Sequence, residues 1–135
     1  MNILLLGGLG FLGLQLKNDL EKALPTADVY ISTSRQELAD EKTVFVNYEN
    51  FESISKLFNF TKPDYIFHLA SNCIRDASNA SLKKGRIRDD NIIKILDALR
   101  VNVKFIFVSS MAVFSPDDKN IRPLQYKPES NYGLE

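Results

Sequence analysis

Residues 1–13 read Met1-Asn-Ile-Leu-Leu-Leu-Gly-Gly-Leu-Gly-Phe-Leu-Gly13, and this stretch decides the fold. Its apolar run, Ile3 to Leu6, is typical of a strand buried on both faces, as in a parallel sheet. Glycines then follow at the spacing Gly-x-x-Gly-x-x-Gly. Leucines recur after them at helical spacing, at Leu12, Leu16, Leu20 and Leu24. The glycines therefore fall where a strand turns into a helix, which is the context expected of a dinucleotide-binding turn.

Each glycine of this turn has its own physical reason. Gly7 lets the chain leave the strand through a backbone conformation that a Cβ would hinder. Gly10 removes a side chain where a pyrophosphate must approach, and Gly13 lets the helix pack tightly on the strand. The N–H groups at the start of the helix, those of Phe11 and Leu12 included, then face the phosphates. A tight turn that binds no ligand is the less favoured alternative.

Composition and charge exclude several classes of protein. The 135 residues suffice for one domain with a real core, and 17 basic and 17 acidic residues cancel. Nucleic acid and anionic membranes are therefore poor candidates as partners. The single cysteine, Cys73, cannot form an internal disulfide, which favours a cytoplasmic protein. No apolar stretch approaches membrane-spanning length. The basic cluster at 83–88 precedes two aspartates and favours a solvated loop and helix start over a binding patch.

Strands and helices alternate along the rest of the chain. Further strands are predicted at 28–31, 43–46, 64–70 and 103–108, the one at 64–70 being apolar throughout and therefore central. Helices are predicted from Phe51 to before Pro63 and over 89–100, with a polar loop or a loop and short helix over 71–86. This alternation predicts an α/β fold with a doubly wound parallel sheet. Ligands would bind at its carboxyl edge.

Four stretches together resemble the extended short-chain dehydrogenase/reductase family, whose members mostly act on nucleotide-sugars as epimerases, reductases and dehydratases. They are the glycine turn at 7–13, Pro-Asp-Tyr-Ile-Phe-His-Leu-Ala at 63–70, Phe-Val-Ser-Ser-Met-Ala-Val-Phe at 107–114 and Asn-Tyr-Gly-Leu-Glu at 131–135. The resemblance implies a Rossmann-like fold in which residues 1–135 form the NAD(P)-binding domain, truncated before the substrate lobe.

The same resemblance implies catalytic roles for Ser110 and Tyr132. A tyrosine can carry the proton that accompanies hydride transfer if its pKa falls from about 10 toward the working pH. In the family a lysine four residues later helps to lower that pKa, and here it would be residue 136. We therefore expect the 135-residue chain to bind cofactor without turnover. Met111-Ala112 stand where dehydratases of the family carry an acidic pair, which disfavours 4,6-dehydratase chemistry.

The cofactor is predicted from the residues that follow the second strand. An NAD-preferring site places a carboxylate there, whereas this chain has Thr33, Ser34 and Arg35. Hydroxyls and a guanidinium favour the 2′-phosphate of NADP(H), with NAD(H) as the alternative. The resemblance adds Leu69 and Ala70 along the cofactor. It also places Asn47 near the adenine, where the family usually has an aspartate.

The leading hypothesis is an NADP(H)-dependent reductase or epimerase acting on a nucleotide-activated sugar. One alternative is a non-catalytic NAD(P)-sensing or binding protein of the same fold, and another is a structural fragment that self-associates through exposed apolar faces. His68 is interpreted as a core or cofactor-adjacent histidine, since no metal site is predicted around it. A homodimer is left open.

Overall fold

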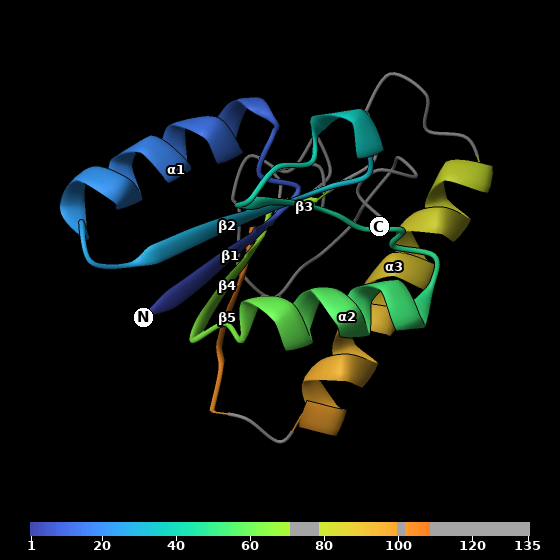
Figure 1. Cartoon of the computed structure of the whole chain (residues 1–135). Helices are drawn as coiled ribbons and strands as arrows, with labels where there is room; N and C mark the ends of the chain where they lie inside the picture. The colour runs from blue at the N-terminus through green and yellow to red at the C-terminus, as the bar shows by residue number, and fades with distance from the viewer. Residues whose placement is uncertain (71–78, 100–101, 109–135) are drawn as a thin grey trace, which may run out of the picture.

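The computed structural model describes residues 1–70, 79–99 and 102–108. In this part of the chain, five parallel strands form one sheet in the order β3-β2-β1-β4-β5, with helices on both faces (Figure 1). The strands are β1 (Asn2–Leu6), β2 (Asp28–Thr33), β3 (Thr43–Phe45), β4 (Tyr65–His68) and β5 (Lys104–Phe107). The helices are α1 (Phe11–Ala23), α2 (Phe51–Thr61) and α3 (Asn79–Leu99), with a short 3-10 turn at Gln36–Leu38.

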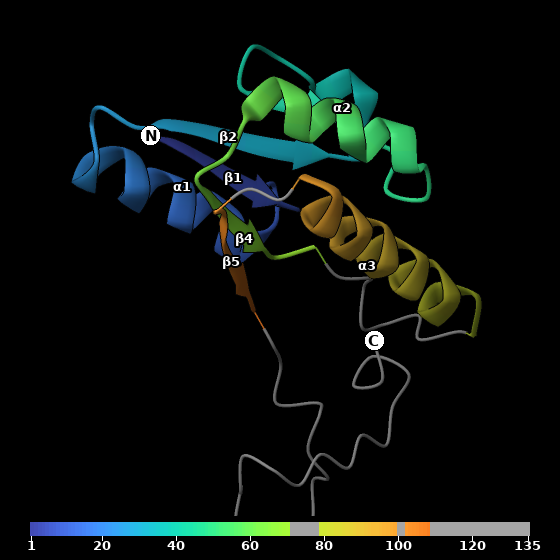
Figure 2. The same ribbon diagram turned by 90° about the horizontal axis from the view of Figure 1, so that it is seen from below.

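The predicted doubly wound parallel sheet is confirmed. The chain moves from β1 through α1 to β2 in one direction, then through α2 and α3 in the opposite direction, so right-handed crossovers place α1 on one face and α2 and α3 on the other. Figure 2 shows this arrangement from below. The strand predicted at 64–70 is interior, because β4 pairs with both β1 and β5. The direction of winding reverses between β1 and β4, which is where such sheets bind ligands.

The core divides along the two faces of the sheet. Alternate residues of β1 point to opposite sides, so Leu4 and Leu6 face α2 and α3, while Ile3 and Leu5 face α1. Both sets are buried, as expected of a central parallel strand. The larger cluster also contains Val46, Ile54, Leu57, Phe58, Ile66, Ile92 and Ile95. Apolar packing therefore anchors the strand ends from which the site is built.

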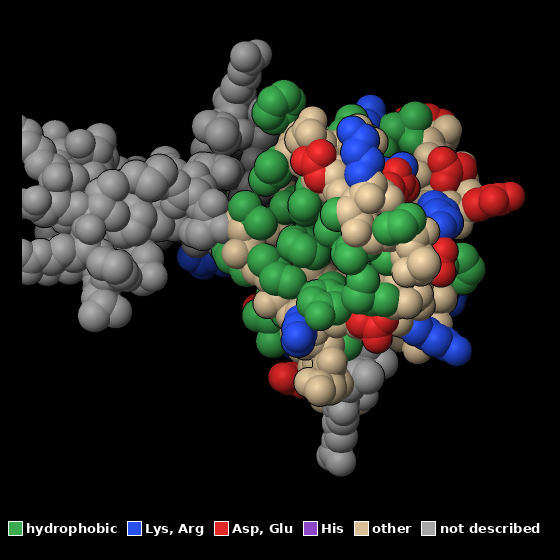
Figure 3. All heavy atoms as spheres, turned by 90° about the vertical axis from the view of Figure 1, so that its left-hand side faces the viewer, with side chains coloured by type: hydrophobic (Ala, Val, Ile, Leu, Met, Phe, Trp, Pro, Cys, Tyr) green, Lys and Arg blue, Asp and Glu red, His purple; other side chains and the backbone are tan. Residues whose placement is uncertain are grey.

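Helix α1 buries less of its leucine row than its spacing suggests. Leu16 and Leu20 pack on the sheet, but the side chains of Leu12 and Leu24 are 52% and 36% exposed. Gly13 is the buried residue of the first turns, so Leu12, one position earlier, points away from the sheet. Leu24 is the C-cap, outside the helix proper. Hydrophobic side chains accordingly gather on the side of the molecule that carries α1 (Figure 3).

Helix α3 begins earlier than predicted. It starts at Asn79, so the described part of the expected loop over 71–86 is helical. The face that α3 turns inward is formed here by Gly85 and Arg88, both buried, before Ile92 and Ile95 follow at the same spacing. Because a glycine and an arginine stand at the inward positions, the first half of the helix lacks the apolar periodicity that would have revealed it.

The start of α2 offers a test of the fold. Asn50 is its N-cap, and the Asn50 Oδ1 accepts the Ser53 N–H at 2.9 Å. We expect Asn50→Ala to lower the free energy of unfolding by about 1 kcal/mol, because this donor loses its partner. Asn59→Ala, in the same helix but exposed, is the control and should be neutral or slightly stabilising. Urea unfolding of both variants measures the difference, and equal loss in the two would contradict the capping role.

Candidate functional site

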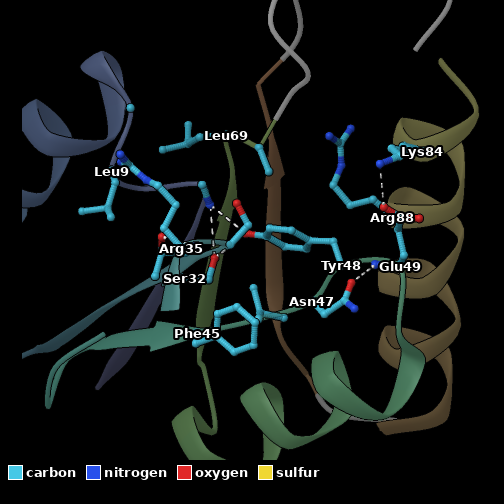
Figure 4. Close-up of a pocket in the computed structure, with 16 residues that line it drawn as sticks. Leu9, Ser32, Arg35, Phe45, Asn47, Tyr48, Glu49, Leu69, Lys84 and Arg88 are labelled. Atoms are coloured by element: carbon cyan, nitrogen blue, oxygen red, sulfur yellow. Dashed lines mark hydrogen bonds and ion pairs between the residues drawn. The ribbon is translucent and has the colours of Figure 1, made fainter. Parts of the chain in front are cut away.

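A cavity of about 660 Å³ lies at the carboxyl ends of the strands (Figure 4). Its size is that of small-molecule sites, which span roughly 300–1,000 Å³. Five segments contribute to it: the glycine turn, the end of β2, the residues after β3, the end of β4 and helix α3. The lining residues are Gly7, Leu9, Gly10, Ser32, Thr33, Ser34, Arg35, Phe45, Val46, Asn47, Tyr48, Glu49, Leu69, Ala70, Lys84 and Arg88.

Gly7 and Gly13 are required by the fold itself. Gly7 has φ +77°, and a Cβ there would lie 2.6 Å from the Ala70 Cα. A Cβ at Gly13 would lie 2.4 Å from the Gly8 carbonyl oxygen, so α1 starts in direct contact with the turn. Backbone atoms cannot move aside for these contacts as a flexible side chain could. The conformational freedom predicted for Gly7 is observed. Gly13 does allow close packing of α1, but its nearest contact is the backbone of Gly8 in the turn rather than the strand.

Gly10 is different, because the folded chain does not need a glycine there. Its φ of −73° suits any residue, and an added Cβ would meet only the Gly7 carbonyl oxygen, at 3.6 Å. The position lies on the wall of the cavity. The space that a side chain would fill is therefore open toward the cavity, where a ligand can approach the backbone.

The start of α1 supplies N–H donors beside this opening. Gly10 is the N-cap and offers no side-chain acceptor, and the first helical bond runs from the Leu14 N–H to the Gly10 carbonyl oxygen. The N–H groups of Phe11, Leu12 and Gly13 thus remain for an anion, which the helix dipole also attracts. The Phe11 side chain is 97% exposed, and neither Phe11 nor Leu12 lines the cavity, so only their backbones can serve the predicted role.

The end of β2 brings polar groups but no carboxylate. Thr33, Ser34 and Arg35 all line the cavity, as predicted from their place in the sequence. The Thr33 Oγ1 accepts the Arg35 N–H at 3.1 Å and thereby shapes the chain after the strand. Ser34 and Arg35 are exposed, and Arg35 lies on the glycine-turn side of the cavity in Figure 4. A negatively charged group in this corner would meet a guanidinium and hydroxyls.

The residues after β3 form a second wall. The Asn47 Oδ1 accepts the Glu49 N–H at 3.0 Å, and the Asn47 N–H donates to the Ser53 Oγ at 2.9 Å. Asn47 can therefore offer a ligand the hydrogens of its amide nitrogen and the second lone pair of its Oδ1. Tyr48 extends beneath the glycine turn, and its hydroxyl oxygen lies 3.0 Å from the Gly7 nitrogen. Burial raises the pKa of Tyr48.

Helix α3 contributes two cations that the sequence analysis did not assign to the site. Lys84 pairs with Glu49 at 3.5 Å across the cavity mouth. Arg88 is buried, and its Nε donates to the Asp89 Oδ1 at 2.7 Å. The interpretation of the basic cluster as a solvated loop is therefore wrong for Arg88. The spacing of Arg88 from Ile92 and Ile95 could have placed it on the inward face of the helix. That inference, however, requires knowing that residues 83–88 are helical.

His68 stands behind the cavity wall, in agreement with a structural role. It is 2% exposed, and its Nε2 lies 3.0 Å from the Asp89 Oδ1. The Phe105 and Phe107 rings pack against it at centroid distances of 5.9 and 5.3 Å. Burial would raise the pKa of Asp89, but the hydrogen bonds from His68 and Arg88 outweigh it and lower that pKa.

Other predicted residues fall in different places. Leu69 and Ala70 lie at the end of β4 and line the cavity. The predicted catalytic residues Ser110 and Tyr132 lie outside the described residues, as does Cys73.

Among residues 1–70, 79–99 and 102–108, no cluster of three or more His, Cys, Asp or Glu side chains could hold a metal ion. Within the same ranges, no helix has the length and apolar character needed to cross a membrane.

Comparison with protein families gives a match over almost the whole chain. The model of the NAD dependent epimerase/dehydratase family matches residues 3–135. A search of curated proteins finds no match.

Solved structures share the fold. UDP-glucose 4-epimerase from Thermotoga maritima superposes with a TM-score of 0.77 at 24% identity, over 99% of this chain and 47% of the epimerase. L-threonine dehydrogenase from Clostridium difficile gives a TM-score of 0.80 at 23% identity, over 98% and 44%. UDP-N-acetylglucosamine 4-epimerase from Bacillus cereus gives 0.79 at 18%, over 98% and 44%. The chain spans less than half the length of each of these proteins.

Proposed function

The chain belongs to the NAD dependent epimerase/dehydratase family, and from that premise we propose that it is the cofactor-binding part of an NADP(H)-dependent oxidoreductase or epimerase that acts on a nucleotide-activated sugar. The observation that carries the proposal is Gly10. It is a glycine that the fold does not require, it opens onto the cavity, and it caps a helix whose first N–H groups lack a side-chain acceptor. A pyrophosphate is the group that fits this combination.

The residues of the cavity fit a nicotinamide dinucleotide. The backbone from Gly10 to Gly13 would hold the pyrophosphate. Ser34 and Arg35 would bind the 2′-phosphate of the adenosine ribose, and the Asn47 amide would face the adenine. Leu69 and Ala70 would lie along the rest of the cofactor, at the end of β4. When bound, the cofactor supplies a carbon that gives or accepts a hydride.

The chemistry of the substrate rests on two residues of the carboxy-terminal part. Ser110 would hold the reacting oxygen of the sugar, and Tyr132 would pass a proton to or from it. The family's description as epimerases and dehydratases, and the UDP-sugar epimerases among proteins of the same fold, support a sugar carried on a nucleotide as the substrate.

The proposal is tested in two steps. We expect the chain to enhance the fluorescence of NADPH on titration, because the nicotinamide leaves water for a protein cavity. Next, nucleotide-linked 4-keto sugars and UDP-sugars are offered with NADPH or NADP⁺ to this chain, which should show no turnover, and to the longer enzyme of which it would be the cofactor-binding part, which should act on them. Absorbance at the nicotinamide band reports net oxidation or reduction, and chromatography of the sugars reports epimerisation. If neither NADPH nor NADH binds, the proposal is wrong from its first step.

A further inference from the structure

One buried hydrogen-bond network joins the glycine turn to two other strand ends. The Tyr48 hydroxyl oxygen lies 3.0 Å from the Gly7 nitrogen and 2.5 Å from the Ser32 Oγ. The Ser32 Oγ is itself 3.1 Å from the same Gly7 nitrogen. Figure 4 shows Tyr48 reaching across the cavity floor toward Ser32. A single backbone N–H at the end of β1 is therefore shared by oxygens from β2 and from the segment after β3.

The Gly7 N–H is the fixed donor of this network, and both hydroxyl oxygens accept from it. The Ser32 Oγ also lies 3.3 Å from the Leu5 carbonyl oxygen, which can only accept. Between the two hydroxyls either oxygen can donate, and when Ser32 donates to Leu5, the Tyr48 O–H donates to the Ser32 Oγ. In that arrangement both hydroxyl hydrogens and the Gly7 N–H are used inside the network, and none is left for a phosphate or a ribose hydroxyl.

Tyr48 is fixed from the opposite side as well. The Asn91 Nδ2, on α3, donates to the Tyr48 carbonyl oxygen at 3.2 Å, and the ring packs against the larger core cluster. Burial raises the pKa of Tyr48, so at neutral pH the hydroxyl keeps the hydrogen that the network needs. Tyr48 thus connects β1, β2 and α3 at one point of the cavity.

We propose that Tyr48 and Ser32 are positioning residues, which hold the glycine turn in the shape that receives the cofactor's pyrophosphate. The inference rests on the proposed function. Gly7 adopts φ +77°, a conformation that glycine enters and leaves easily, so its backbone needs an external restraint. The chain runs directly from Gly7 to Gly10 and the start of α1. A fixed Gly7 N–H therefore fixes the direction in which the phosphate-facing N–H groups point.

The inference predicts a signature that separates this pair from Arg35. The pyrophosphate is common to NADPH and NADH, so Tyr48→Phe, which keeps the ring and removes the hydroxyl, should weaken both dinucleotides alike, by about threefold to tenfold. Ser32→Ala should do the same. In the double variant the losses should not add, because both hydroxyls act through one N–H. In nitrogen-15 NMR, the Gly7 amide should shift and exchange faster with solvent in each variant.

The control is Tyr30→Phe. Tyr30, in β2, packs against Phe60 and does not line the cavity, so its hydroxyl should be dispensable for binding. Fluorescence titration gives the affinities, and urea unfolding shows that each variant is folded. Unchanged affinity in Tyr48→Phe, or a loss confined to NADPH, would overturn the positioning role and leave the proposed function standing. Failure of the parent chain to bind either dinucleotide would overturn both.

Discussion

Gly10→Val should remove NADPH binding and leave the fold nearly intact. A valine side chain would occupy the space through which the pyrophosphate approaches the backbone, and the helix N–H groups would no longer be reached. The folded chain has room for the new Cβ, whose nearest neighbour is the Gly7 carbonyl oxygen at 3.6 Å. Valine is a poorer N-cap than glycine, so a loss in the free energy of unfolding of up to about 1 kcal/mol is expected.

Gly13→Ala is the matched variant, three residues away in the same turn. Its Cβ would lie 2.4 Å from the Gly8 carbonyl oxygen, so either α1 or the turn must move. We expect a loss of roughly 3 kcal/mol in the free energy of unfolding, at the upper end of overpacking effects. Urea unfolding and NADPH titration of both variants test this contrast: Gly10→Val should lose mainly NADPH binding, and Gly13→Ala should lose mainly stability. A folded Gly10→Val chain that binds NADPH as tightly as the parent would show that the turn is only structural.

Arg35→Ala should weaken NADPH selectively. A charge-assisted hydrogen bond contributes roughly 1.5–3 kcal/mol, so NADPH affinity should fall by about tenfold to a hundredfold, with NADH almost unchanged. Because Arg35 is exposed, the loss should shrink as the salt concentration rises. Calorimetry with both dinucleotides, at low and at physiological salt, measures this. Arg86→Ala is the control, since this exposed arginine of α3 does not line the cavity.

A carboxylate introduced at the end of β2, beside Arg35, should have a larger effect and reverse the preference from NADPH to NADH. Thr33 is only 5% exposed, so an aspartate there would have to be desolvated. Ser34 is exposed and lines the cavity, which makes Ser34→Asp the cleaner change. Combined with Arg35→Ala, it should repel the 2′-phosphate and offer the ribose 2′-hydroxyl an acceptor. If Arg35→Ala affects both dinucleotides equally, or neither, the choice of NADP(H) over NAD(H) loses its main support.

The glycine turn could be predicted because its signals are local. A buried strand, three spaced glycines and an amphipathic helix lie within the first two dozen residues, and the parallel sheet follows from their repetition. Even the separate duties of Gly7 and Gly13 could be inferred, because the positive φ of Gly7 and the contact of Gly13 with Gly8 are local in the sequence. The contact of Gly7 with Ala70 is not. The structure adds that, of these three glycines, only Gly10 could carry a Cβ without a clash, which the sequence pattern does not reveal.

The opposite wall of the cavity could not be predicted, because its contacts join residues that lie far apart in the sequence. The Tyr48 hydroxyl meets Gly7 and Ser32 across 41 and 16 residues, so the contact depends on how three strands align. Arg88 was missed because a buried cation breaks the apolar pattern of α3, and in the structure its guanidinium pairs with Asp89. Local patterns thus located the glycine turn, whereas the contacts of Tyr48 and Ser32 with it emerged from tertiary packing.

The central claim is that a nicotinamide dinucleotide binds with its pyrophosphate at the glycine turn. Glycine amides are well separated in nitrogen-15 NMR spectra, and four of the six glycines in the chain lie in this turn. On titration with NADPH, we expect the largest shifts at Gly10 and Gly13 and at the Phe11 and Leu12 amides, with α2 amides unmoved. Shifts that avoid these residues, or that fall mainly elsewhere while NADPH binds, would contradict it.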